Sequence, residues 1–105
     1  MDNITDLVTE MKRLIDSAQE KQIQLRAFGG LAILVHSQGD PKFFKRDEPD
    51  FDFLVPKSDR QKLESFFREM GYSPNKQFNL LNGTERQIYY YDDSGFPHVD
   101  ILLGD

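Results

Sequence analysis

The chain has 105 residues, which is enough for one folded domain around one hydrophobic core. Hydrophobic residues make up 38% of it and aromatic residues 12%, so the composition is that of a globular protein, and the absence of cysteine excludes disulfides and thiolate-bound metals. The 18 acidic residues exceed the 13 basic ones, and the net charge of −5 argues against a broad nucleic-acid-binding surface.

The first third of the chain predicts a helix, a strand and a second helix. Apolar residues at helical spacing predict an amphipathic helix over residues 4–18. Residues 22–28 alternate as in a short strand, which runs into Gly29-Gly30 and then into the apolar residues 31–35, where we expect a helix. Residues 39–49 have the composition of a loop, with two prolines, one glycine and three cationic side chains. These cations are Lys42, Lys45 and Arg46.

An acidic strand over residues 50–56 follows this loop. Because side chains alternate between the two faces of a strand, Asp50 and Asp52 point the same way, and the apolar Phe51, Phe53 and Val55 point the other way. Two adjacent carboxylates repel each other, which is tolerated where both face water or where a divalent cation lies between them. Oxygen ligands of this kind suit magnesium or manganese.

The second half of the chain predicts one helix and three strands. Ser58 and Gln61 have the spacing of a capping box, and the helix that they open is expected to end at Gly71, with Asp59 on its solvent side. Asn82-Gly83 between two apolar stretches predicts a hairpin over residues 78–91.

Residues 96–103 alternate as a final strand that carries Asp100 on the face opposite to its core side. The expected order is therefore α, β, α, β, α, β, β, β, which is an α/β (α+β) fold with an antiparallel tail. We expect residues 1–105 to form a single domain of this class.

Three acids on one face of a sheet predict a metal site for phosphoryl transfer. Magnesium or manganese held there would bridge phosphate oxygens, and Gly29-Gly30 before a helix would allow a phosphate to approach its N-terminus. Lys42, Lys45 and Arg46 are within reach of a triphosphate tail.

A simpler interpretation stays open for each motif. Asp-x-Asp on a strand is also typical of a solvated face, and Gly-Gly is also plain punctuation between elements. We interpret His36 and His98 as ordinary surface or edge residues rather than ligands, and the tyrosine run 89–91 as strand packing.

These motifs together resemble the nucleotidyltransferase fold of the polymerase beta superfamily over about residues 25–103. The matching residues are Gly29-Gly30-Leu31-Ala32, Arg46 before Asp50-Phe51-Asp52, Leu54-Val55, Gly71-Tyr72 and Val99-Asp100-Ile101-Leu102. The likeness is greatest to small bacterial members and to toxin-type enzymes of the AbiEii kind, which belong to toxin–antitoxin pairs. It implies a mixed sheet flanked by helices, Asp50 and Asp52 as metal ligands and Asp100 as the third acid and candidate base. It also implies nucleotide binding, with Gly29 and Gly30 as phosphate contacts.

Two departures from the family pattern bear on function. Many members carry serine directly after the glycine, whereas Leu31 follows Gly30 here. Larger members continue past the third acid into helices that complete the nucleotide pocket, whereas this chain stops at Asp105. We therefore expect either a fragment that lacks the C-terminal helical part or a minimal protein that requires a partner chain.

The resemblance implies transfer of a nucleoside monophosphate from a nucleoside triphosphate, such as ATP, to an acceptor hydroxyl on an RNA end, a protein or a small molecule. The alternatives are a non-catalytic nucleotide-binding or interaction module of the same fold, and a plain scaffold with a solvated acidic face. The longest apolar run, residues 27–35, is far short of the ~20 residues of a membrane span, so we expect no membrane contact and a cytoplasmic location.

Overall fold

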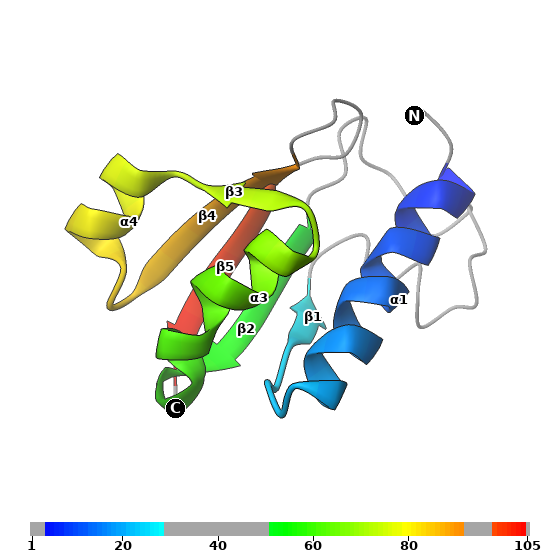
Figure 1. Ribbon diagram of the computed structural model, residues 1–105, viewed down its shortest axis with the longest axis horizontal. Coiled ribbons are helices and arrows are strands. Elements are labelled where there is room, and N and C mark those ends of the chain that lie inside the picture. Colours follow the sequence, from blue (N-terminus) through cyan, green and yellow to red (C-terminus); the bar gives the residue numbers. More distant parts are fainter. Residues whose placement is uncertain (1–3, 29–50, 92–97, 105) are drawn as a thin grey trace.

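A five-stranded mixed sheet forms the centre of the protein (Figure 1). The structure is a computed structural model that describes residues 4–28, 51–91 and 98–104. The strand order is β1-β2-β5-β4-β3, with β2 and β5 parallel and the other neighbours antiparallel. The predicted α/β class with a mixed sheet is thereby confirmed. The strands are β1 Arg26–Phe28, β2 Phe51–Pro56, β3 Tyr72–Pro74, β4 Arg86–Tyr91 and β5 Val99–Gly104.

Two helices, α1 (Ile4–Glu20) and α3 (Leu63–Glu69), lie on the same side of the sheet, in front of it in Figure 1. The predicted alternation of β2 is confirmed, because Phe51, Phe53 and Val55 are fully buried while the residues between them are half-buried. The core therefore occupies the layer between the sheet and these helices. Its other members are Leu7, Val8, Met11, Leu14, Ala18, Ile23, Leu25, Leu63, Phe66, Phe67, Tyr72, Tyr89, Val99, Ile101 and Leu103.

A buried polar cluster fastens α1 to the rest of the fold. Glu10 is only 5% exposed, and its carboxylate accepts hydrogen bonds from the Tyr72 hydroxyl at 2.7 Å and from Arg13 Nε at 2.6 Å. Arg13 also donates to the main-chain oxygen of Met70 at 3.1 Å. The hydrogen bond with Glu10 raises the pKa of Arg13, and burial raises the pKa of the Tyr72 hydroxyl. The cluster ties the predicted amphipathic helix, confirmed here, to Met70 and to Tyr72 at the start of β3.

The predicted capping box at Ser58 and Gln61 is wrong. Residues Lys57–Lys62 form a 3-10 helix, and α3 begins only after it, without a side-chain cap at Lys62. Asp59 is also not on the solvent side. It is 8% exposed, and its carboxylate accepts the backbone N–H of Gln24 at 3.0 Å, so it ties this segment to the turn before β1.

The predicted hairpin over residues 78–91 is wrong in its first half, because Lys76–Asn82 form a helix, α4. Asn75 caps it by accepting the Phe78 N–H at 3.0 Å, and Gly83 has φ −65°, which is not the positive angle expected of a tight turn. The Asn79 side chain then pairs with both backbone groups of Ile88, which fastens α4 to β4.

Other element boundaries agree with the sequence in part. Strand β1 begins at Arg26 rather than at residue 22, and the short strand β3 was not predicted. Gly71 ends the α3 region with φ +96°, as a glycine after a helix commonly does. Two tyrosines of the run pack as predicted, because Tyr89 stacks on Phe67 at 4.5 Å and Tyr91 meets Tyr72 edge-on at 5.0 Å between ring centroids. The predicted helix at 31–35, the loop 39–49 and His36 lie outside the described residues.

Candidate functional site

Two of the three predicted acids face each other across the centre of the sheet. Asp52 on β2 and Asp100 on β5 are direct partners in the parallel register, on strands that lie about 4.8 Å apart. Both are half-buried, and both alternate with buried core residues, so they point away from α1 and α3. The third acid, Asp50, and the proposed phosphate contacts lie outside the described residues. These contacts are Gly29, Gly30, Lys42, Lys45 and Arg46.

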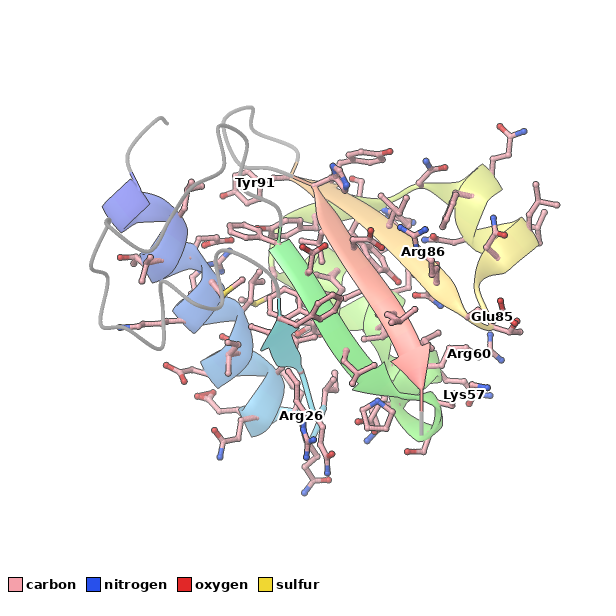
Figure 2. All side chains as sticks on the ribbon, turned by 180° about the vertical axis from the view of Figure 1, so that it is seen from behind. Arg26, Lys57, Arg60, Glu85, Arg86 and Tyr91 are labelled. Carbon is pink, nitrogen blue, oxygen red and sulfur yellow. The ribbon has the colours of Figure 1, made fainter. Side chains whose placement is uncertain are left out.

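The face that carries these acids has no helix over it in the part of the chain that the structure describes (Figure 2). The register arranges its side chains in two rows that cross the strands. In the first row, Phe28 and Ile88 flank the two carboxylates. In the second row, two arginines flank two leucines, in the order Arg26, Leu54, Leu102, Arg86.

Arg86 binds the Asp100 carboxylate from the neighbouring strand. Its Nε lies 3.3 Å from Oδ1 and its Nη2 lies 2.5 Å from Oδ2, so the fork of the guanidinium engages both oxygens. The Arg86 side chain is 48% exposed and that of Asp100 is 22% exposed. Arg86 Cζ also lies 5.7 Å from the centre of the Phe78 ring, which comes from α4. In Figure 2 Arg86 lies on β4, beside β5.

Sequence reasoning missed Arg86. It has no motif around it, and its neighbour across the sheet depends on the register between β4 and β5, which no short pattern reveals. Ile88 is opposite Asp100, and Arg86 lies two residues before Ile88 on the same strand. The link between Arg86 and Asp100 can therefore be recognised only once this register is known.

The donor set of Asp52 and Asp100 fits a hard divalent cation. Both groups supply carboxylate oxygens, which magnesium and manganese prefer, and neighbouring positions on parallel strands allow one ion to reach both. Among the described residues no group of three acidic or histidine side chains is close enough to hold a metal. An ion bound by these two carboxylates would take its remaining ligands from other groups, such as a substrate phosphate or water.

A shallow apolar depression adjoins the acids on the same face. It has a volume of about 370 Å³, and Leu54 and Leu102 are its floor because they are the next outward residues after Asp52 and Asp100. Arg26, Ala27 and Phe28 complete its lining. None of the described residues forms an ion pair with Arg26. The depression suits a planar or apolar group, and Arg26 places a positive charge at its margin.

On the other side of the acids lie two exposed rings. Tyr90 is 45% exposed, and its ring centre lies 6.1 Å from that of His98. The prediction that His98 is a surface residue is confirmed, because its side chain is exposed next to β5.

A second hollow, of about 470 Å³, lies on the helical side of the molecule. Its charged groups are of mixed sign, with Arg60 and Lys76 beside Glu64, and none of the predicted site residues lines it. The acids therefore remain the best-supported site despite the smaller depression beside them.

Comparison with known proteins places the chain in a family. No helix of the described part of the chain is long and apolar enough to cross a membrane. No curated protein and no solved structure matches the chain. Residues 2–102, which include every residue of the predicted site, match a protein family described as an uncharacterised nucleotidyltransferase. The match covers nearly the whole chain, and the protein therefore belongs to this nucleotidyltransferase family.

Proposed function

We propose that this protein transfers a nucleoside monophosphate from a nucleoside triphosphate to an acceptor hydroxyl, with magnesium or manganese as its cofactor. The observation that carries the proposal is the direct pairing of Asp52 and Asp100 on the face of the sheet away from α1 and α3. Membership of a nucleotidyltransferase family supports the reaction type.

The proposed roles follow from the chemistry of each residue. Asp50 and Asp52 would hold the cation, and Asp100 would complete the acidic set. A divalent cation bound there would neutralise phosphate charge and increase the electrophilicity of the phosphorus atom. Gly29 and Gly30 would contact the triphosphate through their N–H groups, and Lys45 and Arg46 through their positive charge.

The chain's own groups would manage the proton of the acceptor. The acceptor oxygen attacks the α-phosphorus, the bond from that phosphorus to the β-phosphate oxygen breaks, and pyrophosphate leaves. The hydroxyl proton passes to the carboxylate of Asp100 or to water. The apolar depression at Leu54 and Leu102 lies beside the place where this transfer would occur, so it supports an acceptor or base with a flat apolar part. The acceptor is an RNA end, a protein or a small molecule.

A second candidate function, a non-catalytic nucleotide-binding or interaction module, is favoured by one observation. Both oxygens of Asp100 are already engaged by Arg86. A protein that had lost catalysis but kept its fold would retain such an ion pair as a structural contact. This candidate predicts nucleotide binding without the release of pyrophosphate.

Thermal unfolding with and without Mn²⁺ and a nucleoside triphosphate tests the proposed site. A ligand at a hundred times its dissociation constant stabilises a fold by ~2.7 kcal/mol, which is a shift of several degrees in a domain of this size. Asp52→Asn and Asp100→Asn should abolish the shift. Asp16→Asn is the control: it removes the same charge from an exposed position on α1, so the shift should persist.

Transfer itself is tested with nucleoside triphosphates labelled at the α-phosphate and with RNA, protein and small-molecule acceptors. Label on an acceptor together with pyrophosphate release supports the enzyme, and nucleotide binding without either supports the non-catalytic module. An unchanged melting temperature of the parent under all conditions, or equal responses of the Asp52 and Asp16 variants, would refute the site.

A role as the toxin of a toxin–antitoxin pair, with a cytoplasmic location, extends this proposal on the strength of the motif resemblance. Induced expression in a bacterial host should then arrest growth, and Asp52→Asn should relieve the arrest. Growth that is equal for parent and variant would remove this extension and leave the proposed reaction standing.

A further inference from the structure

The ion pair between Arg86 and Asp100 occupies the carboxylate that the proposed reaction requires. Both oxygens of Asp100 accept hydrogen bonds from the same guanidinium, at 3.3 and 2.5 Å. Arg86 is opposite Leu102 in the register, so it reaches diagonally toward β5 to make this contact. A planar guanidinium fits a carboxylate in this two-point manner better than any other side chain does.

A divalent cation between Asp52 and Asp100 competes with this arrangement for two reasons. The cation requires oxygen lone pairs of Asp100 that the guanidinium engages, and it places two positive charges next to a third. Arginine stays protonated at all ordinary pH values, so the conflict is relieved only by movement of the side chain.

Arg86 is able to make such a movement without disturbing the core. Its side chain is 48% exposed on the uncovered face, and the Phe78 ring lies 5.7 Å from Cζ. An aromatic ring at this distance attracts a guanidinium, so Phe78 already contacts Arg86 while it binds Asp100 and still offers it a favourable contact after the carboxylate is released.

We infer that Arg86 is a positioning residue that takes the place of the cation at Asp100 and exchanges this contact when metal and nucleotide bind. The inference rests on the proposed function, because it assumes that Asp100 serves the metal site. It also alters an expectation drawn from the sequence. The metal-free protein does not carry the full repulsion of grouped acids, because Asp100 already has a counter-ion.

The exchange has a consequence for the order of binding. A cation that binds without nucleotide must displace the Arg86 guanidinium, and the only new interactions that it forms are those with the carboxylates. A triphosphate brings negative charge that offsets both the cation and the released Arg86. The protein should therefore bind free metal weakly and bind metal together with nucleotide well.

Binding of Mn²⁺ to the full chain, followed by the electron paramagnetic resonance signal of free Mn²⁺, tests this inference without requiring activity. Arg86→Gln should bind Mn²⁺ about tenfold more tightly than the parent, the size expected for one charge-assisted contact in a partly exposed setting. Arg86→Lys, which keeps the charge and loses the fork, should lie between the two.

Arg68→Gln is a matched control. Arg68 also forms an ion pair, with Glu64 at 3.1 Å, and its side chain is 47% exposed against 48% for Arg86. It lies on α3, on the helical side of the sheet, so its removal changes the net charge equally without changing the acidic face. Its Mn²⁺ affinity should equal that of the parent.

Melting temperatures in EDTA give a second measurement. Arg86→Gln should melt lower than Arg68→Gln without metal, because Asp100 then loses its counter-ion beside Asp52, and Mn²⁺ should remove the difference. If the ion pair is purely structural, its loss in Arg86→Gln will lower the melting temperature and leave the Mn²⁺ affinity unchanged.

The outcomes distinguish the exchange at Asp100 from the proposed function. If the parent and Arg86→Gln bind Mn²⁺ equally, the exchange is overturned and the proposed function stands. If neither binds Mn²⁺, alone or with a non-hydrolysable triphosphate, the proposed metal site and the exchange both fall. If Arg86→Gln does not fold, Arg86→Lys decides, since affinity equal to that of the parent contradicts the exchange and tighter binding supports it.

Discussion

Removal of a single oxygen atom, in Tyr72→Phe, tests whether the buried cluster on α1 holds the helix in place. The Tyr72 hydroxyl donates to Glu10 at 2.7 Å, and Glu10 is 5% exposed. A hydrogen bond to a charged group typically contributes about 1.5–3 kcal/mol to stability. The lower end applies here, because the same carboxylate oxygen keeps the Arg13 N–H at 2.7 Å. We therefore expect a loss of about 1.5 kcal/mol, or roughly 6–12 °C in melting temperature.

The ring contacts of Tyr72 are preserved in this substitution. Phenylalanine keeps the edge-on contacts with Phe67 at 5.7 Å and with Tyr91 at 5.0 Å, so only the hydroxyl changes. Urea and thermal unfolding of the parent and variant give the free-energy difference.

Tyr90→Phe is the control for the same chemical change. Among the described residues, the Tyr90 hydroxyl accepts a hydrogen bond from Asn75 Nδ2 at 3.1 Å. The side chain is 45% exposed, so the expected loss is below about 0.5 kcal/mol. Equal losses for the two variants would refute the view that the Glu10 cluster stabilises the fold more than an exposed hydroxyl does.

Two further predictions concern other buried polar groups. Asp59→Ala should lower the free energy of unfolding in urea by about 1 kcal/mol, because it removes the acceptor of the Gln24 N–H, and it should leave the Mn²⁺ response intact. Unchanged stability of this variant would contradict the prediction. Burial raises the pKa values of Tyr72 and Tyr89, so their stabilisation is fully present below the unfolded pKa near 10 and is lost as pH rises above it. Each tyrosine should contribute a decline of about 1.4 kcal/mol per pH unit there, and Tyr72→Phe should remove one such contribution; equal slopes in the parent and Tyr72→Phe would contradict the buried, neutral state of Tyr72.

Alternation along the strands made part of the fold predictable from sequence. On β2 and β5, buried apolar residues alternate with more exposed ones, and Asp52 and Asp100 each lie between two apolar residues, so the pattern indicates which side of the two acids is buried. Their pairing across parallel strands was not predictable in the same way. It depends on strand order, which is decided by how the helices and the remaining strands pack together.

The errors have local physical causes. The stretch 78–82 looks like a strand by composition, yet Leu80 and Leu81 are 85% and 75% exposed, so their apolar character is not used for burial. The decisive signal was Asn75, whose side chain caps α4 through the Phe78 N–H. Asp59 was misplaced for a similar reason, since a carboxylate that satisfies a distant backbone N–H looks like any surface acid in the sequence.

Among the described residues no helix covers the face that carries the candidate site, and the charges of that site supply a physical reason. Asp52 and Asp100 lie on the two strands that form the parallel centre of the sheet, with Arg86 beside them. A helix packed over this face would remove three charged groups from water, and the desolvation cost amounts to several kcal/mol for each ion. The other face of the same strands carries Phe51 and Ile101, which are fully buried, so both helices gain free energy by packing there. On the proposed function, a cation or a triphosphate would approach from the face away from α1 and α3, where it would displace water and one exposed arginine and leave the packed core intact.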